Sequence, residues 1–177
     1  MASLTLYDTV VPVLIRGLNT FDHVLTQAEK YAKEKNEDVN SYVQDRLVED
    51  QLPLGFQVQN TSKAVQVAIG RLTGTEPAFF ENNEKTIDDL HNRIKKTLDQ
   101  LKALDVAQVN ARAGQEVDLM NSVVPWTGFS HKVTVQQAVL THNFPNFFFH
   151  ITTAYSILRA KGVPLGKRDF IAEFLGF

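Results

Sequence analysis

The sequence predicts an all-α protein in which four long helices pack as one bundle, within a single domain over residues 1–177. Three observations predict this fold. Apolar residues recur every three or four positions in four long segments, which places them on one face of a helix. Helix-start and helix-stop signals flank most of these segments. The chain has 177 residues, 44% of them hydrophobic, which is enough to bury the core of one domain.

The first helix is indicated by an apolar stripe whose members are spaced alternately four and three residues apart. We expect Pro12 to lie in or near its first turn, where a missing N–H costs least. The charged run 33–38 marks its end. The stripe consists of Leu14, Leu18, Phe21, Leu25, Ala28 and Ala32.

The second helix is expected to begin at Pro53 and to end at Gly74, a residue suited to the left-handed conformation that closes many helices. Before it, residues 40–48 are compatible with a short connecting helix. Residues 75–83 contain a proline and read as a loop.

The third helix is predicted to start at Thr86, which caps it together with Asp89 three residues later. The helical pattern breaks up from residue 105 onward. Weak alternation of apolar and polar residues over 116–119 and 129–133 is compatible with two short strands or with an ordered loop.

The fourth helix begins at a Thr134-x-x-Gln137 capping box and ends near Gly162. It is apolar on nearly every side, which is typical of a helix at the centre of a core or shared with a partner. Pro145 lies inside this helix and predicts a kink or a division into two segments. Residues 167–177 are too apolar to be left in water, so we expect them to pack back on the bundle.

The composition limits the classes of partner. The formal net charge is -2, from 18 basic and 20 acidic residues, so the chain shows no basic stripe for nucleic acid. It has no polybasic run for a membrane surface, no apolar stretch long enough to span a bilayer and no signal-peptide pattern at its start. Without cysteine, it forms no disulfide or thiolate site. We therefore expect a soluble, cytoplasmic protein with no nucleic-acid or membrane partner.

The candidate site is a set of polar residues on the apolar fourth helix. At 100° per residue, His142, Asn146 and His150 fall within about 80° of one another. A buried polar group without a partner costs ~1–3 kcal/mol, so these side chains need partners. Gln57 and Thr61, one turn apart on the second helix, are the expected ones.

Two interpretations of this cluster remain open. It is either a structural network that fixes how the helices pack, or a pocket for a small molecule with His142 and His150 as catalytic acid/base groups. The two imidazoles lie about 12 Å apart on an unbroken helix, too far to share one metal ion. Asn146 is a weak ligand, so we assign no metal ligand, although the Pro145 kink leaves a divalent metal possible. The residues expected to line the pocket are Gln57, Thr61, Asn146, Tyr7, Trp126 and Tyr155.

Three stretches resemble a known family. They are LTLYDTVVPVLIRGL (4–18), DRLVEDQLPLGFQVQ (45–59) and PNFFFHITTAYSILRAKGVPLGKRDF (145–170). They are similar to bacterial and fungal proteins of unknown function that are grouped with the DinB/YfiT-like superfamily of metalloenzymes. The resemblance covers nearly the whole chain, and it implies a DinB-like four-helix bundle that pairs into a homodimer.

The resemblance also implies a metal site, because DinB-like enzymes bind a divalent metal through one histidine on the second helix and a His-x-x-x-His pair on the last. Here that pair reads His142-x-x-x-Asn146, and the second helix has no histidine. Three functions follow as hypotheses. The first is a small-molecule-binding protein that acts as a metal-independent enzyme through a histidine. The alternatives are a non-enzymatic dimeric bundle with a structural polar core and a divalent-metal enzyme with an incomplete histidine triad.

Overall fold

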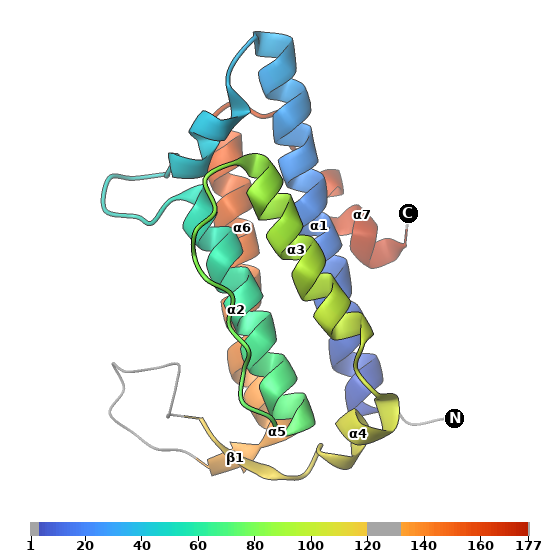
Figure 1. Ribbon diagram of the computed structural model, residues 1–177. Helices are drawn as coiled ribbons and strands as arrows, with labels where there is room; N and C mark the ends of the chain where they lie inside the picture. The colour runs from blue at the N-terminus through green and yellow to red at the C-terminus, as the bar shows by residue number, and fades with distance from the viewer. Residues whose placement is uncertain (1–3, 120–131, 177) are drawn as a thin grey trace.

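A computed structural model gives the arrangement of residues 4–119 and 132–176. It confirms the all-α bundle of long helices with a two-stranded insertion before the last one (Figure 1). The last long helix is built from three consecutive pieces, of which the middle one is a π-helical turn. The four long elements are α1 (Leu6–Lys35), α2 (Leu54–Thr73), α3 (Ile87–Lys102) and the series α5 (Val135–Ala138), η2 (Val139–Asn143), α6 (Phe144–Ala160).

The first helix starts earlier than its apolar stripe. Thr5 and Asp8 form a reciprocal capping box that begins α1 at Leu6. Pro12, which was expected in or near the first turn, lies inside the helix, in its second turn. The helix ends at Asn36, whose φ of 56° is left-handed.

The ends of α2 and α3 lie where local sequence signals predicted them. Pro53 precedes the first residue of α2, and Gly74 closes the helix with a φ of 78°. Thr86 and Asp89 form the predicted capping box of α3. The connector before α2 is the 3-10 helix η1 (Val39–Gln44), which is shorter than the predicted segment.

The irregular region after α3 contains the short helix α4 (Val106–Ala111) and a two-stranded antiparallel sheet. In that sheet, β1 (Glu116–Asp118) pairs with β2 (Lys132–Thr134). Strands rather than a loop therefore form at the two predicted alternations. Residues 129–131 of the second alternation lie outside the described residues.

The last long helix is divided as Pro145 predicts. Thr134 and Gln137 form the capping box of α5, and the amide of Phe144 donates to the carbonyl of Val139, five residues back. Proline has no N–H, and its ring clashes with the carbonyl four residues earlier in a regular helix. The π-helical turn directly before Pro145 relieves that conflict by widening the helix.

The C-terminal helix α7 (Lys167–Leu175) packs on α1, as predicted for the apolar tail (Figure 1). Three side chains of α1 hold it: Arg16 and Thr20 donate to its backbone carbonyls, and His23 contacts its carboxylate Asp169 at 3.0 Å. None of its residues is fully buried. It therefore covers the bundle without entering the core.

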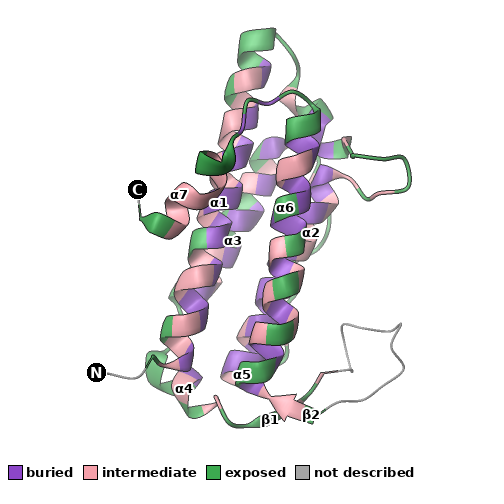
Figure 2. Cartoon of the chain, turned by 180° about the vertical axis from the view of Figure 1, so that it is seen from behind, coloured by how far each residue is buried: buried purple, intermediate pink, exposed green. Residues whose placement is uncertain are grey.

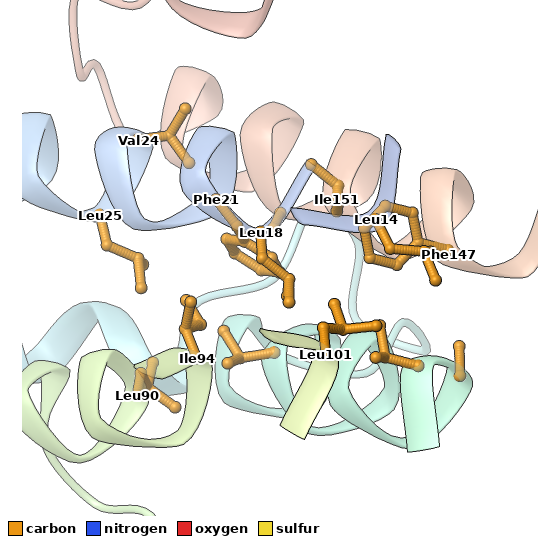
Figure 3. Close-up of a cluster of buried hydrophobic side chains, with 14 of the residues drawn as sticks. Leu14, Leu18, Phe21, Val24, Leu25, Leu90, Ile94, Leu101, Phe147 and Ile151 are labelled. Carbon is orange, nitrogen blue, oxygen red and sulfur yellow. The ribbon is translucent and has the colours of Figure 1, made fainter. Parts of the chain in front are cut away.

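The core lies between the long helices, whose buried positions form stripes along their inner faces (Figure 2). Helices α1 and α6 approach closely at Gly17, where an added side chain would collide with the ring of Phe147. No helix within the described ranges is long and apolar enough to cross a membrane. The side chains labelled in Figure 3 come from α1 (Leu14, Leu18, Phe21, Val24, Leu25), α3 (Leu90, Ile94, Leu101) and α6 (Phe147, Ile151).

Candidate functional site

One polar contact joins α2 to α6 inside the bundle. His150 Nδ1 lies 2.8 Å from Gln57 Oε1, and Gln57 Nε2 donates to the carbonyl of Leu52, also at 2.8 Å. Because the amide nitrogen is engaged by that carbonyl, the amide oxygen faces the imidazole, and Nδ1 of His150 must carry the hydrogen. The Nε2 atom then carries a lone pair. It has no hydrogen-bond partner among the described residues.

The surroundings of His150 keep its imidazole neutral. The residue is only 8% exposed, and the rings of Phe56 and Phe149 pack against it edge-on, with centroids 6.1 and 5.3 Å away. Burial lowers the pKa of His150 from 6.5 to about 4. The charged form is disfavoured because an apolar environment does not solvate it. At neutral pH the side chain is therefore an uncharged acceptor.

A cavity of about 360 Å³ borders the same part of α6. It is open to solvent, and five of its six lining residues lie on the stretch of α6 that contains His150, although His150 itself is not one of them. The lining is Leu47, Phe148, Phe149, Thr152, Thr153 and Ser156.

A second polar cluster lies at the π-helical turn itself. Arg71 of α2 is buried, and its Nη1 atom lies 3.2 Å from His142 Nδ1 and 3.5 Å from the carbonyl of Ala138. The same nitrogen donates a short hydrogen bond to Asn143 Oδ1. The amide nitrogen of Asn143 donates to the carbonyl of Ala64 at 2.9 Å. This cluster thus fastens the C-terminal half of α2 to the start of the last helix.

The guanidinium of Arg71 determines the state of His142. Since a guanidinium only donates, Nδ1 of His142 must accept, and the hydrogen of the neutral ring lies on Nε2. Burial lowers the pKa of His142, and the positive charge of Arg71 lowers it further. The ring therefore presents an N–H donor.

The structure does not bring the three predicted polar residues of the last helix into one cluster. His150 meets Gln57, as predicted, but His142 meets Arg71 instead. Asn146 is half-buried, and its side chain has no hydrogen bond to another described residue. His142 and His150 are about 12 Å apart along the helix axis, so they meet α2 at different levels, near its end at Arg71 and near its start at Gln57.

Within the described part of the chain, none of the other predicted pocket residues makes a hydrogen bond or a ring contact with His150. The hydroxyl of Thr61 donates to the carbonyl one turn earlier in its own helix. Tyr155 packs on Phe170 of α7, with ring centroids 5.8 Å apart. Tyr7 is half-buried at the start of α1. Trp126 lies outside the described residues.

Two residues of the second cluster were not predicted from the sequence. Arg71 stands beside Leu72 at the end of the apolar stripe of α2, and a charged residue at this position was the available signal. Asn143 was also missed, although it lies seven residues before His150, and therefore on the same face of a helix with 100° per residue; it is 1% exposed.

The side chains do not fit the metal site that the family resemblance implied. The ring of His142 contacts a cation, and α2 contains no histidine to complete a triad. Within residues 4–119 and 132–176, no group of three or more His, Cys, Asp or Glu side chains is placed to hold a metal ion.

Comparisons with known proteins agree with the fold. Residues 6–171 match the sequence profile of a domain of unknown function, DUF1993. Among solved structures, a DinB family member protein from Shewanella denitrificans is 32% identical to this chain, with a TM-score of 0.81. The alignment covers 94% of this chain and 91% of that one. No curated protein matches this chain.

Proposed function

This chain belongs to the DUF1993 family of domains of unknown function and has a DinB-like fold, and we propose that it binds a small molecule beside His150. The Nε2 atom of this imidazole accepts a hydrogen bond or a proton from that molecule. The observation that carries the proposal is the chain of hydrogen bonds from His150 through Gln57 to the carbonyl of Leu52. It fixes the hydrogen on Nδ1 and leaves Nε2 as a base.

The adjacent cavity supports a mostly apolar ligand. Its volume of about 360 Å³ is within the usual range for small-molecule sites. Phe148 and Phe149 supply aromatic surface, and Phe149 is 60% exposed, which is unusual for a phenylalanine on a bundle helix. A ligand with an aromatic or aliphatic body and one O–H or N–H donor fits these groups.

The lowered pKa of His150 defines what the imidazole can do. With a pKa of about 4, the ring is unprotonated at neutral pH, so its lone pair is always available. A base with so low a pKa removes protons only from comparatively acidic groups. Hydrogen bonding to a hydroxyl or amide is its first role, and proton transfer follows only for an acidic substrate.

Paired probes test this proposal. Phenol and toluene have similar size and shape, but only phenol donates a hydrogen bond. We expect the wild type to bind phenol about three- to tenfold more tightly, since one hydrogen bond contributes roughly 0.5–1.5 kcal/mol. His150→Asn keeps a donor toward Gln57 but removes the Nε2 acceptor, so it should lose this preference. Chemical-shift titrations by NMR measure both affinities.

One control variant shows whether the probes occupy this cavity. Thr152→Trp places a large ring at an exposed position of the cavity and should block both probes. Equal binding of phenol and toluene to the wild type, or a phenol preference that persists in His150→Asn, contradicts the proposal. If neither probe binds and His150→Asn only changes the free energy of unfolding, the contact is structural, as in the alternative of a non-enzymatic bundle.

A further inference from the structure

The Arg71 cluster has a charge that its own neighbours do not neutralise. Arg71 is 8% exposed and lies where the C-terminal end of α2 meets α5 and the π-helical turn (Figure 1). All three of its hydrogen bonds leave from one nitrogen, Nη1, and all three acceptors are uncharged. Among the described residues, no carboxylate lies within ion-pair distance of it.

The second buried arginine of the chain shows what a paired one looks like. Arg93 is 3% exposed, and its Nη1 atom lies 2.6 Å from the carboxylate of Glu84. The same group donates to the carbonyl of Glu81 at 2.8 Å. A buried charge is normally compensated in this way. Arg71 is buried to a similar degree but has no carboxylate partner in the described part of the chain. Its hydrogen bonds to uncharged acceptors therefore leave its positive charge uncompensated.

A second guanidinium adds to the positive charge at this end of α2. Arg112 donates from Nε to the backbone carbonyl of Arg71 at 2.9 Å. Its guanidinium fills the space above Gly74, where a side chain would collide with it. Because residue 74 has no side chain, the Arg112 guanidinium can lie beside the last turn of α2.

The remaining hydrogen-bonding groups all donate. Nε and Nη2 of Arg71 have no acceptor among the described residues, and neither does the Nε2–H of His142. The amide of Asn143 is already used by Arg71 and by the carbonyl of Ala64. A site of free donors next to a cation selects a ligand group that only accepts and is negatively charged. Guanidinium groups match the paired oxygens of carboxylate and phosphate particularly well.

We propose that Arg71, assisted by His142 and Arg112, binds one carboxylate or phosphate group of a ligand as its counter-ion. Asn143 positions the guanidinium for this role. The carbonyl dipoles at the C-terminal end of α2 offset only part of the positive charge. Burial lowers the pKa of the Arg71 guanidinium, because the charged form is less well solvated there. The site does not depend on the His150 site, from which nearly two turns of α6 separate it.

Thermal unfolding of the full chain with sodium acetate or sodium phosphate tests this site. Sodium chloride at matched ionic strength is the reference. A ligand that binds only the folded state raises its Tm. We expect a saturable rise of about 2–4 °C for a protein of this size at several times the Kd. A response to acetate alone assigns a carboxylate ligand, a response to phosphate alone assigns a phosphate, and a response to both assigns the shared anion chemistry.

Three variants decide whether Arg71 is responsible. Arg71→Met removes the charge and should abolish the response. Asn143→Asp supplies Arg71 with an internal carboxylate, so it should abolish the response while keeping the guanidinium paired, and it remains informative if Arg71→Met does not fold. Arg168→Met changes an exposed arginine of α7 and should respond like the wild type. No rise in the wild type beyond that in chloride, or a wild-type response in Arg71→Met or Asn143→Asp, overturns the proposal.

Discussion

His142 and His150 lie on the same helix and both contact α2, but their partners give them opposite hydrogen-bonding character. Gln57 accepts from Nδ1 of His150, which leaves the Nε2 atom of that ring as an acceptor. Arg71 donates to Nδ1 of His142, which leaves the Nε2 atom of that ring as a donor. The two contacts thus offer a ligand different groups, one suited to a donor and the other to an anion.

This difference shows that the residue facing a buried histidine determines which of its ring nitrogens carries the hydrogen. Burial lowers the pKa of both rings, and at His142 the positive charge of Arg71 adds to the effect. Both rings are therefore neutral at pH 7, yet for partly different reasons. The two environments lie at different levels of the bundle, since Gln57 is near the start of α2 and Arg71, which also bonds to Asn143, is near its end.

The largest expected effect on stability is that of replacing Asn143. Asn143→Leu removes the acceptor of Arg71 and the donor to the carbonyl of Ala64. Two buried groups then lose their partners, so the free energy of unfolding should fall by about 3–4 kcal/mol. Asn146→Leu changes a half-buried residue without such contacts and should alter it by less than about 1 kcal/mol. Urea denaturation followed by circular dichroism measures both. Equal losses of unfolding free energy in the two variants would mean that the hydrogen bonds of Asn143 do not stabilise the fold.

The fold was predictable because its signals are local. The capping box of Thr86 and Asp89 lies within one turn, and Gly74 ends its helix by its own backbone freedom. Pro12 shows the limit of such signals: its preference for a first turn was outweighed by the capping box that starts α1 earlier. The single domain, the homodimer and the cytoplasmic location remain predictions.

The candidate site was predictable only in part because it depends on helix rotation. Gln57 was correctly matched to His150, since both lie on regular stretches of helix. Asn146 was chosen because it lies four residues before His150, but Asn143, seven residues before it on the same face, is the asparagine that is buried. The partner of Asn143 is distant in sequence, and no short-range pattern connects it to Arg71.

The two histidines should contribute differently to the pH dependence of the free energy of unfolding. The pKa of His150 is about 4 in the folded protein and near 6.5 when unfolded. Between these values the unfolded chain binds a proton that the folded chain does not, so stability is lost as pH falls. From pH 7 to pH 5 this single group should lower the free energy of unfolding by about 2 kcal/mol. Urea denaturation across this pH range measures the change.

The matched variant for this experiment is His150→Asn, which does not titrate but keeps a donor toward Gln57. Its free energy of unfolding should fall less than that of the wild type between pH 7 and pH 5. His142→Asn should remove a smaller part of the pH dependence, since that ring is less deeply buried. His91 acts in the opposite direction, because Asp22 raises its pKa, but it contributes equally to all three proteins. Parallel pH profiles for the wild type and His150→Asn would contradict the burial of a neutral His150.

The tautomers of the two histidines can be observed directly, although the variants that change them should have the smallest effect on stability. In ¹⁵N NMR spectra of the imidazoles, the protonated nitrogen should be Nδ1 in His150 and Nε2 in His142. Arg71→Met should release the tautomer of His142 and leave that of His150 unchanged. Gln57→Leu should have the reverse effect. Both changes are visible in the ring resonances even where the free energy of unfolding changes by less than about 1 kcal/mol.

The result for His150 depends on one assignment, the orientation of the Gln57 amide. The carbonyl of Leu52 can only accept, so the amide nitrogen must face it and the amide oxygen must face the imidazole. A hydrogen on Nε2 of His150 would mean that this contact with Leu52 is absent in solution, and the histidine would then offer a donor to the cavity. A small-molecule site at His150 would then select acceptors, and the difference between the two ends of the helix would disappear.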